Sequence, residues 1–417
     1  MYHKTTPNKN MEKKTWPFSL PSSASFTLIL LLLLLSTTNF KAAASSNPGN
    51  GIICYKSIIS FGDSLADTGN LLRLSSSNKP PPHFFRPPYG ESYFHHPTGR
   101  CSDGRLVVDF IAESLDLPLL PPYLAGKDAV YHSLDDFKGV NFAVAGATAL
   151  DDSFFREKGI HNPFTNISLG IQLGWFKDML HSLCQINSSG CQEMARSSLF
   201  LVGEIGGNDY NHPLLLGLDI EATRSFVTPV IRTIGSAIEE LIELGAVTLV
   251  VPGNFPIGCS AAYLTQFRSP NPEDYDTAGC LKWLNNFSKY HNKMLQLELN
   301  RIRQLHPHTT IIYADYYNAA MRMYRFPQKY GFARTLSACC GGGGAYNYNP
   351  SVVCGNSNET STSCDDPSRN ICWDGLHLTE AAYRWIAQGI LQGPFSVPPL
   401  NGLSCTTTSD EKLVQQN

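Results

Sequence analysis

The 417-residue sequence has no tract rich in lysine and arginine, and its formal net charge is only −3. Proteins that bind nucleic acid carry a basic patch or stripe, so its absence argues against a nucleic-acid partner. No Cys-x-x-Cys pair occurs, which argues against a structural zinc site. The glycine run 341–344 is not followed by Lys and Ser or Thr, so it is no phosphate-binding loop. The motifs that usually signal metal or phosphate binding are therefore missing.

The sequence also lacks an apolar run of the roughly 20 residues that a membrane span needs. The apolar run Phe26–Leu35 follows a lysine-containing region and precedes the small residues Ala42–Ala44. This order is typical of a secretory signal peptide, which we assign to residues 1–44, with Met11 as an alternative start. We therefore expect no stable membrane anchor and a secreted protein, located in the extracellular space, the cell wall or the vacuole.

Cysteines and glycosylation sequons fit an oxidising, secretory environment. All twelve cysteines lie beyond residue 44, so disulfides are expected. The loop between Cys184 and Cys191 is short, and we expect these two to pair. A second, local group of bridges is expected among Cys339, Cys340, Cys354, Cys364 and Cys372. Sequons for N-linked glycans stand at Asn166, Asn187, Asn286 and Asn358.

Apolar runs that end at small or polar turns alternate with segments of helical periodicity. The runs predict strands at Ile58–Phe61, Val140–Ala145, Ser198–Val202, Ala246–Val251 and Thr309–Asp315. Helices are predicted at Gly104–Glu113, Leu169–Leu183, Ala222–Leu244, Leu281–Leu305 and Thr379–Gln392. This alternation predicts an α/β fold whose parallel sheet is covered on both faces, with all strand ends on one edge. No linker or repeat interrupts the pattern, so we expect a single domain over residues 45–417.

Five residues at predicted turns could perform nucleophilic acyl transfer. Ser64 lies at the corner that ends the first strand, where open α/β sheets place their chemistry. His377 is a candidate base, and Asp374, three residues earlier, could fix its tautomer. The backbone N–H groups of Ser64 and Gly146 and the side-chain amide of Asn208 could bind an oxyanion.

Each of these signals has an ordinary structural interpretation when it is taken alone. A Gly-Asp-Ser-Leu tetrapeptide arises by chance, and Asp is a common helix cap. Four turns at strand ends that hold the four required chemical types together indicate a serine hydrolase. Position 66 is Ala66, so the Gly-x-Ser-x-Gly elbow of α/β-hydrolases is absent. The segment Lys79–His96 is too rich in proline to be a helix interior and is predicted to be a loop. Its part Lys79–Pro88 could line the entrance to a substrate site, but we favour a rigid surface loop.

The order and spacing of these blocks resemble the GDSL esterase/lipase (SGNH hydrolase) family from about Lys56 to about Gly393. The matching blocks are Gly62–Leu65, Asn141–Thr148, Gly206–Asp209 and Asp374 with His377. Secreted plant members, the branch that includes acetylajmalan and sinapine esterases, are also similar at Gly253–Cys259 and Ala314–Asn318. The resemblance implies a three-layer α/β/α fold with a central five-stranded parallel sheet (the SGNH or flavodoxin-like hydrolase fold) and no metal or organic cofactor.

The same resemblance assigns roles to the candidate residues. It implies Ser64 as nucleophile, His377 as general base, Asp374 as the group that orients it, and Ser64, Gly146 and Asn208 as oxyanion donors. The expected function is a secreted serine carboxylic-ester hydrolase that forms an acyl-serine intermediate on small acylated metabolites or lipids. No apolar lid is evident, which favours small soluble esters, and we expect a monomer. The alternatives are an acyltransferase that uses the same triad and a catalytically inert secreted binding glycoprotein.

Overall fold

The computed structural model describes residues 54–75, 82–126, 134, 136–186, 188–356, 361–400 and 403–404. Residues Ile52–Asn417 form one compact unit. The predicted signal peptide and the sequons at Asn187 and Asn358 lie outside the described residues. Within the described part, no helix is both long and apolar enough to cross a membrane.

A six-stranded sheet in the order β3-β2-β4-β5-β6-β9 forms the centre of this unit. Its first five strands are parallel, at Ser57–Phe61 (β2), Gly139–Asn141 (β3), Ser198–Val202 (β4), Thr248–Pro252 (β5) and Thr310–Ala314 (β6). The sixth, Ser396–Val397 (β9), pairs with β6 in the antiparallel sense. The five predicted parallel strands are thus confirmed, whereas the two-residue edge strand was too short to show a periodicity.

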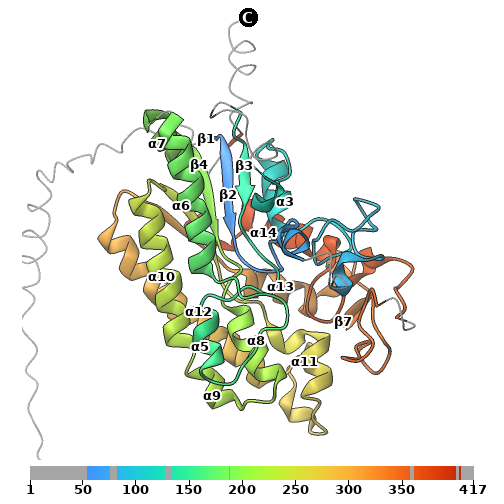
Figure 1. The fold of residues 1–417 in the computed structure, drawn as a ribbon. Coiled ribbons are helices and arrows are strands. Elements are labelled where there is room, and N and C mark those ends of the chain that lie inside the picture. The colour runs from blue at the N-terminus through green and yellow to red at the C-terminus, as the bar shows by residue number, and fades with distance from the viewer. Residues whose placement is uncertain are drawn as a thin grey trace, which may run out of the picture. The chain divides into compact units, whose positions relative to one another are not determined.

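Helices cover both faces of the sheet (Figure 1). One face packs against α6, α10 and α12, at Leu169–Ile186, Val227–Glu243 and Lys282–Leu305. The other packs against α3, α13 and α14, at Val107–Ser114, Tyr316–Arg325 and Glu380–Leu391. Successive side chains of a strand point to opposite faces, so Ile59 and Phe61 join the first core while Ile58 joins the second. Burial on both faces explains why the strands are continuous apolar runs.

Shorter elements occupy the loops and edges. The other α-helices of the described residues are Asn70–Leu74 (α2), Asp152–Arg156 (α5), Ser188–Ser197 (α7), Gly207–Leu215 (α8), Ile220–Arg224 (α9) and Ala261–Gln266 (α11). Two further pairs of parallel strands join Cys54–Tyr55 (β1) to Leu403–Ser404 (β10) and Arg334–Ala338 (β7) to Asn370–Cys372 (β8).

The predicted helix Ala222–Leu244 is in fact two helices, because α9 ends at Arg224 and α10 begins at Val227. Pro229 explains the break, since proline lacks an N–H and is tolerated only in the first turn of a helix. Ser225 adds to it by donating its hydroxyl to the carbonyl of Ala222 at 2.6 Å. Pro229 was visible in the sequence, but the apolar periodicity across residues 222–244 favoured a single helix.

Four disulfides link described cysteines: Cys184–Cys191, Cys259–Cys280, Cys339–Cys364 and Cys340–Cys354. The first was predicted, and the last two confirm a local group of bridges. Cys372 was wrongly placed in that group, because it is a buried free thiol, as is Cys101. The Cys259–Cys280 bridge was not predicted; its partners meet where the turn at Gly258 lies against the start of α12, with the Leu281 N–H donating to the carbonyl of Gly258 at 2.9 Å.

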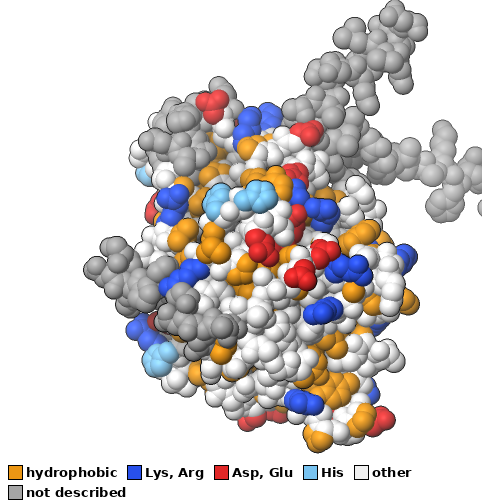
Figure 2. All heavy atoms as spheres, turned by 90° about the vertical axis from the view of Figure 1, so that its right-hand side faces the viewer, with side chains coloured by type: hydrophobic (Ala, Val, Ile, Leu, Met, Phe, Trp, Pro, Cys, Tyr) orange, Lys and Arg blue, Asp and Glu red, His pale blue; other side chains and the backbone are white. Residues whose placement is uncertain are grey.

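The surface is mixed in charge on the face that Figure 2 shows, where basic and acidic side chains are interspersed with hydrophobic ones. Elsewhere on the surface, charged side chains pair across neighbouring helices, as Lys177 of α6 does with Glu240 of α10 at 2.7 Å. The predicted glycosylation sites Asn166 and Asn286 are both exposed, so a glycan could be attached there without unfolding.

Candidate active site

The chain order of the strands creates a switch point at the carboxyl edge of the sheet. The chain passes from β2 outward to β3 and then returns to β4 on the other side of β2. In flavodoxin-like sheets, ligands bind in the crevice at this reversal. Ser64 follows β2 and Asn208 lies in the first turn of α8, which follows β4. The candidate residues therefore flank the crevice that the topology creates.

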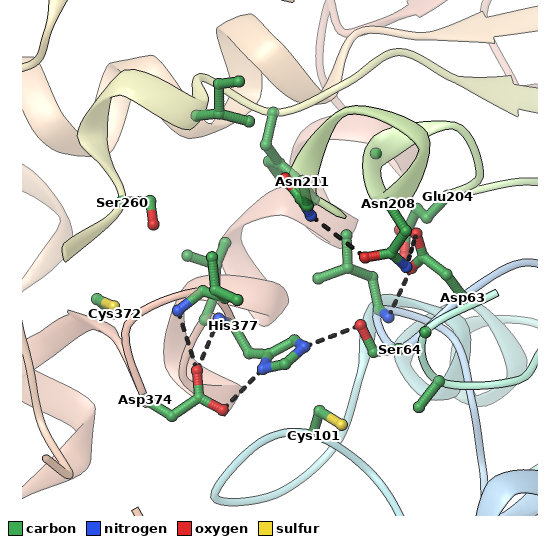
Figure 3. Close-up of a pocket in the computed structure, with 18 of the residues that line it drawn as sticks. Asp63, Ser64, Cys101, Glu204, Asn208, Asn211, Ser260, Cys372, Asp374 and His377 are labelled. Atoms are coloured by element: carbon green, nitrogen blue, oxygen red, sulfur yellow. Dashed lines mark hydrogen bonds and ion pairs between the residues drawn. The ribbon is translucent and has the colours of Figure 1, made fainter. Parts of the chain in front are cut away.

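Ser64, His377 and Asp374 form a continuous hydrogen-bonded chain in this crevice (Figure 3). The Nε2 atom of His377 lies 2.8 Å from Ser64 Oγ, and its Nδ1 atom lies 2.7 Å from Asp374 Oδ2. The serine is 313 residues away from the histidine in sequence, so only the tertiary fold brings them into contact. In this arrangement His377 can take the hydroxyl proton while Asp374 holds the other ring nitrogen protonated.

A tight turn between β8 and α14 fixes Asp374 and His377. The N–H of Trp373 donates to the carbonyl of His377 at 2.8 Å, which closes the turn. Asp374 Oδ1 accepts the backbone N–H groups of Leu376 at 3.1 Å and His377 at 2.9 Å. The spacing of three residues thus lets one carboxylate organise the turn with Oδ1 and hold the imidazole with Oδ2.

Electrostatics favour an ion pair between the two groups. Burial alone would raise the pKa of Asp374, but the nearby His377 and the hydrogen bonds it accepts hold this pKa well below its usual range. Burial alone would lower the pKa of His377, but the charge and hydrogen bond of Asp374, with a contribution from Asp63, raise it above its ordinary value. Asp374 therefore stays ionised and makes His377 a stronger base.

The three candidate oxyanion donors, Ser64, Gly146 and Asn208, all line the cavity beside the triad. Among the hydrogen bonds of the described residues, none uses the backbone N–H of Ser64 or of Gly146. Gly146 has φ +83°, and a Cβ there would lie 2.9 Å from the Cβ of Phe164, so only glycine fits. Asn208 Nδ2 donates to the carbonyl of Ala147 at 3.0 Å and only weakly, at 3.4 Å, to Asp63 Oδ2. The N–H that points weakly to Asp63 is therefore the one that could donate a hydrogen bond to a developing oxyanion.

Buried side chains lock the turns after β2 and β3 together. Asp67 accepts N–H groups from its own turn and also that of Ala145, at 2.8 Å, next to Gly146. Asn70 donates to the carbonyls of Asn141 and Ala143, each at 2.8 Å. These bonds cross between two loops, so they fix the position of Ser64 relative to Gly146.

Asp209 fixes the position of Asn208 in a similar way, by bonding to the loop after β3. Its carboxylate accepts the N–H groups of Ala149 at 2.8 Å and Leu150 at 3.0 Å, which ties the loop after β3 to the start of α8. Burial raises the pKa of Asp209 to about 7, with the two backbone bonds opposing the shift. The sequence placed Asp209 in a matching block but gave no sign of its contacts.

The crevice opens into a cavity of about 280 Å³. Its described lining contains the carboxyl groups of Asp63, Glu204 and Asp374 but no lysine or arginine. Otherwise the wall is largely apolar and aromatic, with Phe84, Tyr89, Phe164, Phe255, Tyr263, Tyr324 and Tyr348 among its residues. A neutral substrate with an apolar part suits such a wall.

The proline-rich loop forms part of this wall, which agrees with the alternative weighed for Lys79–Pro88 and not with the favoured rigid surface loop. Within its described part, His83, Phe84 and Tyr89 line the cavity, and Phe84 and Tyr89 are buried. Proline content indicated a non-helical loop, but no periodic pattern in it could show which side chains turn inward. The favoured surface-loop interpretation was therefore wrong for His83 and Phe84.

Comparisons with known proteins match most of the chain. The family model described as GDSL-like Lipase/Acylhydrolase matches residues 58–390. Two GDSL esterase/lipases of Arabidopsis thaliana are 55% and 54% identical over 349 residues, covering 83% of this chain and 87% and 86% of theirs. A sinapine esterase of Brassica napus is 52% identical over 349 residues, or 83% of this chain and 88% of its own.

A solved structure gives a much weaker match. An alpha/beta hydrolase enzyme from the metagenome of Lake Arreo aligns over 82% of this chain and 96% of its own, with 12% identity and a TM-score of 0.35. This likeness is too low to bear on the fold. The assignment to a family therefore rests on the family model and the plant relatives.

Proposed function

The chain belongs to the GDSL-like Lipase/Acylhydrolase family, and from that premise we propose that it hydrolyses carboxylic esters with Ser64 as the nucleophile. His377 is the general base and acid, and Asp374 holds its tautomer. Ser64, Gly146 and Asn208 donate to the oxyanion. The observation that carries the proposal is the 2.8 Å contact between His377 Nε2 and Ser64 Oγ, with Asp374 on the opposite ring nitrogen.

The reaction proceeds in two halves. As Ser64 Oγ attacks the ester carbonyl carbon, its proton moves to His377 Nε2, and the carbonyl oxygen becomes an oxyanion. Cleavage of the ester C–O bond returns this proton to the leaving alkoxide and leaves an acyl-Ser64 intermediate. A water molecule then attacks the acyl group and gives its proton to His377. Collapse of the second tetrahedral adduct releases the acid and restores the serine hydroxyl.

We propose small, uncharged soluble esters as substrates and secretion as the route of the protein. The small cavity, whose described lining contains no lysine or arginine, supports the first. The disulfides and the exposed sequons at Asn166 and Asn286 support the second. Hydrolysis of a series of p-nitrophenyl esters from acetate to palmitate by the purified protein tests the substrate class. Rates that peak at short acyl chains are expected, and rates that peak at palmitate would contradict it.

The pH dependence follows from the ion pair. His377 must be neutral to accept the proton, and Asp374 raises the pKa of His377 above its ordinary 6.5. We therefore expect kcat/KM to rise with pH, with the midpoint of the acid limb above 6.5. A pH series of kcat/KM with one soluble ester measures it. A midpoint below 6.5 would mean that burial, which lowers the pKa, dominates over Asp374.

Asn208→Ala is expected to lower kcat by about 10²–10³-fold with a smaller change in KM, because the amide acts on the oxyanion and not on the bound ester. Steady-state kinetics measure it. Asn318→Ala removes an exposed amide outside the crevice that bonds only within its own turn, and this control should keep wild-type kcat. Equal kcat in Asn208→Ala and wild type would remove Asn208 from the oxyanion site.

A further inference from the structure

A fourth side chain is bonded to the triad. We infer that Tyr89 is a positioning residue that donates its hydroxyl to Asp374 and thereby tunes the basicity of His377. This inference rests on the function proposed above and deepens it. The two atoms, Tyr89 Oη and Asp374 Oδ2, are 2.7 Å apart, and the residues are 285 positions apart in sequence.

The contact completes the coordination of the Asp374 carboxylate. Oδ2 receives His377 Nδ1 and the Tyr89 hydroxyl, and Oδ1 receives two backbone N–H groups. An ionised carboxylate has about four acceptor positions, so the set is full. Each donor also restricts the rotation of the carboxylate, and the orientation of the imidazole depends on that rotation.

The structure fixes Tyr89 in this position. Its side chain is only 1% exposed, and its ring lies edge-on to Trp373, the residue before Asp374, with centroids 5.8 Å apart. A Cβ at Gly355 would lie 3.3 Å from Tyr89 Cε2, so the backbone closes over the ring. The loop that bears Tyr89 is itself tied down, since the Gly90 N–H donates to the carbonyl of Ser102 at 3.0 Å.

The hydroxyl must be the donor, because an ionised carboxylate only accepts. Burial, and then the charge of Asp374, raise the pKa of Tyr89 well above its ordinary value, so the donor stays protonated in the working range. Its hydrogen bond helps to lower the pKa of Asp374. Without it the carboxylate would attract the proton on His377 Nδ1 more strongly, and the pKa of His377 would rise.

Other titratable groups face the same pair. Burial raises the pKa of the thiols and phenol nearby and lowers that of the imidazole, so these groups are neutral near pH 7: Cys101, Cys372, Tyr348 and His83. The guanidinium of Arg86 faces His83. Asp63 is the exception, because burial raises its pKa to about 7, within the range of the acid limb. Among the hydrogen bonds of the described residues, none joins Tyr89 to Asp63. A difference in pH profile between two variants that both keep Asp63 therefore reports on Tyr89.

The test compares Tyr89→Phe with wild type and with Tyr210→Phe. Tyr210 is also 1% exposed and also bonds through its hydroxyl, at 2.8 Å to Nδ1 of the buried His291, which is not part of the triad. Both variants lose one buried hydrogen bond, so both should lose a similar small amount of thermal stability. Only Tyr89→Phe should lose kcat, on the order of tenfold, and only its acid limb should move to higher pH.

A second variant keeps the test valid if Tyr89→Phe folds poorly. Incorporating 3-fluorotyrosine at position 89 retains the ring and makes the hydroxyl a stronger donor, so the acid limb should move to lower pH. Unchanged profiles in both variants, or a loss of kcat with an unmoved limb, would overturn the inference and leave a packing role. Wild type and Ser64→Ala are assayed alongside. Equal activity in those two would instead overturn the proposed function, so the two failures are distinguishable.

Discussion

Ser64→Ala is expected to lower kcat by on the order of 10⁴-fold or more. Without Oγ there is no nucleophile, and water would have to attack the bound ester directly. The oxyanion donors and the binding site remain, so a residual rate above the uncatalysed reaction should persist. Stopped and steady-state assays with an activated ester measure both rates.

Ser60→Ala is the matched control for this substitution. Ser60 lies in β2, four residues before Ser64, and its buried hydroxyl has no hydrogen-bond partner among the described residues. Removing it should leave kcat and thermal stability close to wild type. If Ser64→Ala kept more than about a tenth of the wild-type kcat, the acyl-serine mechanism would be wrong.

Asp374→Asn is expected to lower kcat by about 10³–10⁴-fold near neutral pH. The amide is similar in size, so the turn should persist, but it can present an N–H where Oδ2 now accepts from His377 and Tyr89. The imidazole would then favour the tautomer that carries its proton on Nε2 and could no longer take the proton of Ser64. Kinetics over a pH series measure both the loss and the change in the acid limb.

Asp219→Asn provides the control for Asp374→Asn. Asp219 caps α9 by accepting the Ala222 N–H at 2.7 Å in an exposed position, and asparagine is nearly as good a cap. This variant should keep both its activity and its stability. A loss of less than about tenfold in Asp374→Asn, with intact folding, would show that His377 does not depend on this carboxylate.

The parallel sheet was predictable because its strands are buried on both faces, which makes each of them a short, continuous apolar run such as Ser198–Val202. The positions of the candidate residues in the fold were predictable too, because each of them lies just after a strand or close to the start of a helix. The antiparallel strand β9 was not predictable, because a strand of two residues is too short to show an alternation of apolar and polar side chains. Its pairing depends on where the chain returns after α14.

The site residues were proposed from motif blocks, whereas the contacts around them were not foreseeable. Tyr89 sits in a proline-rich loop, and no local pattern shows that its hydroxyl meets a carboxylate 285 residues away. For Tyr89 a real contact was missed, whereas for Cys372 a contact was wrongly predicted. Its proximity in sequence to other cysteines suggested a bridge that the fold does not form. Such long-range contacts depend on the packing of whole layers, which local sequence does not encode.

The most direct test of the central claim is labelling of the purified protein with a fluorophosphonate probe, with Ser64→Ala alongside and the modified peptide identified by mass spectrometry. Such a probe reacts with a serine only when an assembled base activates it. We predict one labelled peptide that contains Ser64, and no labelling of the folded Ser64→Ala variant. A folded wild-type protein that resists the probe, or a label on another serine, would contradict the account and favour a binding role for this fold.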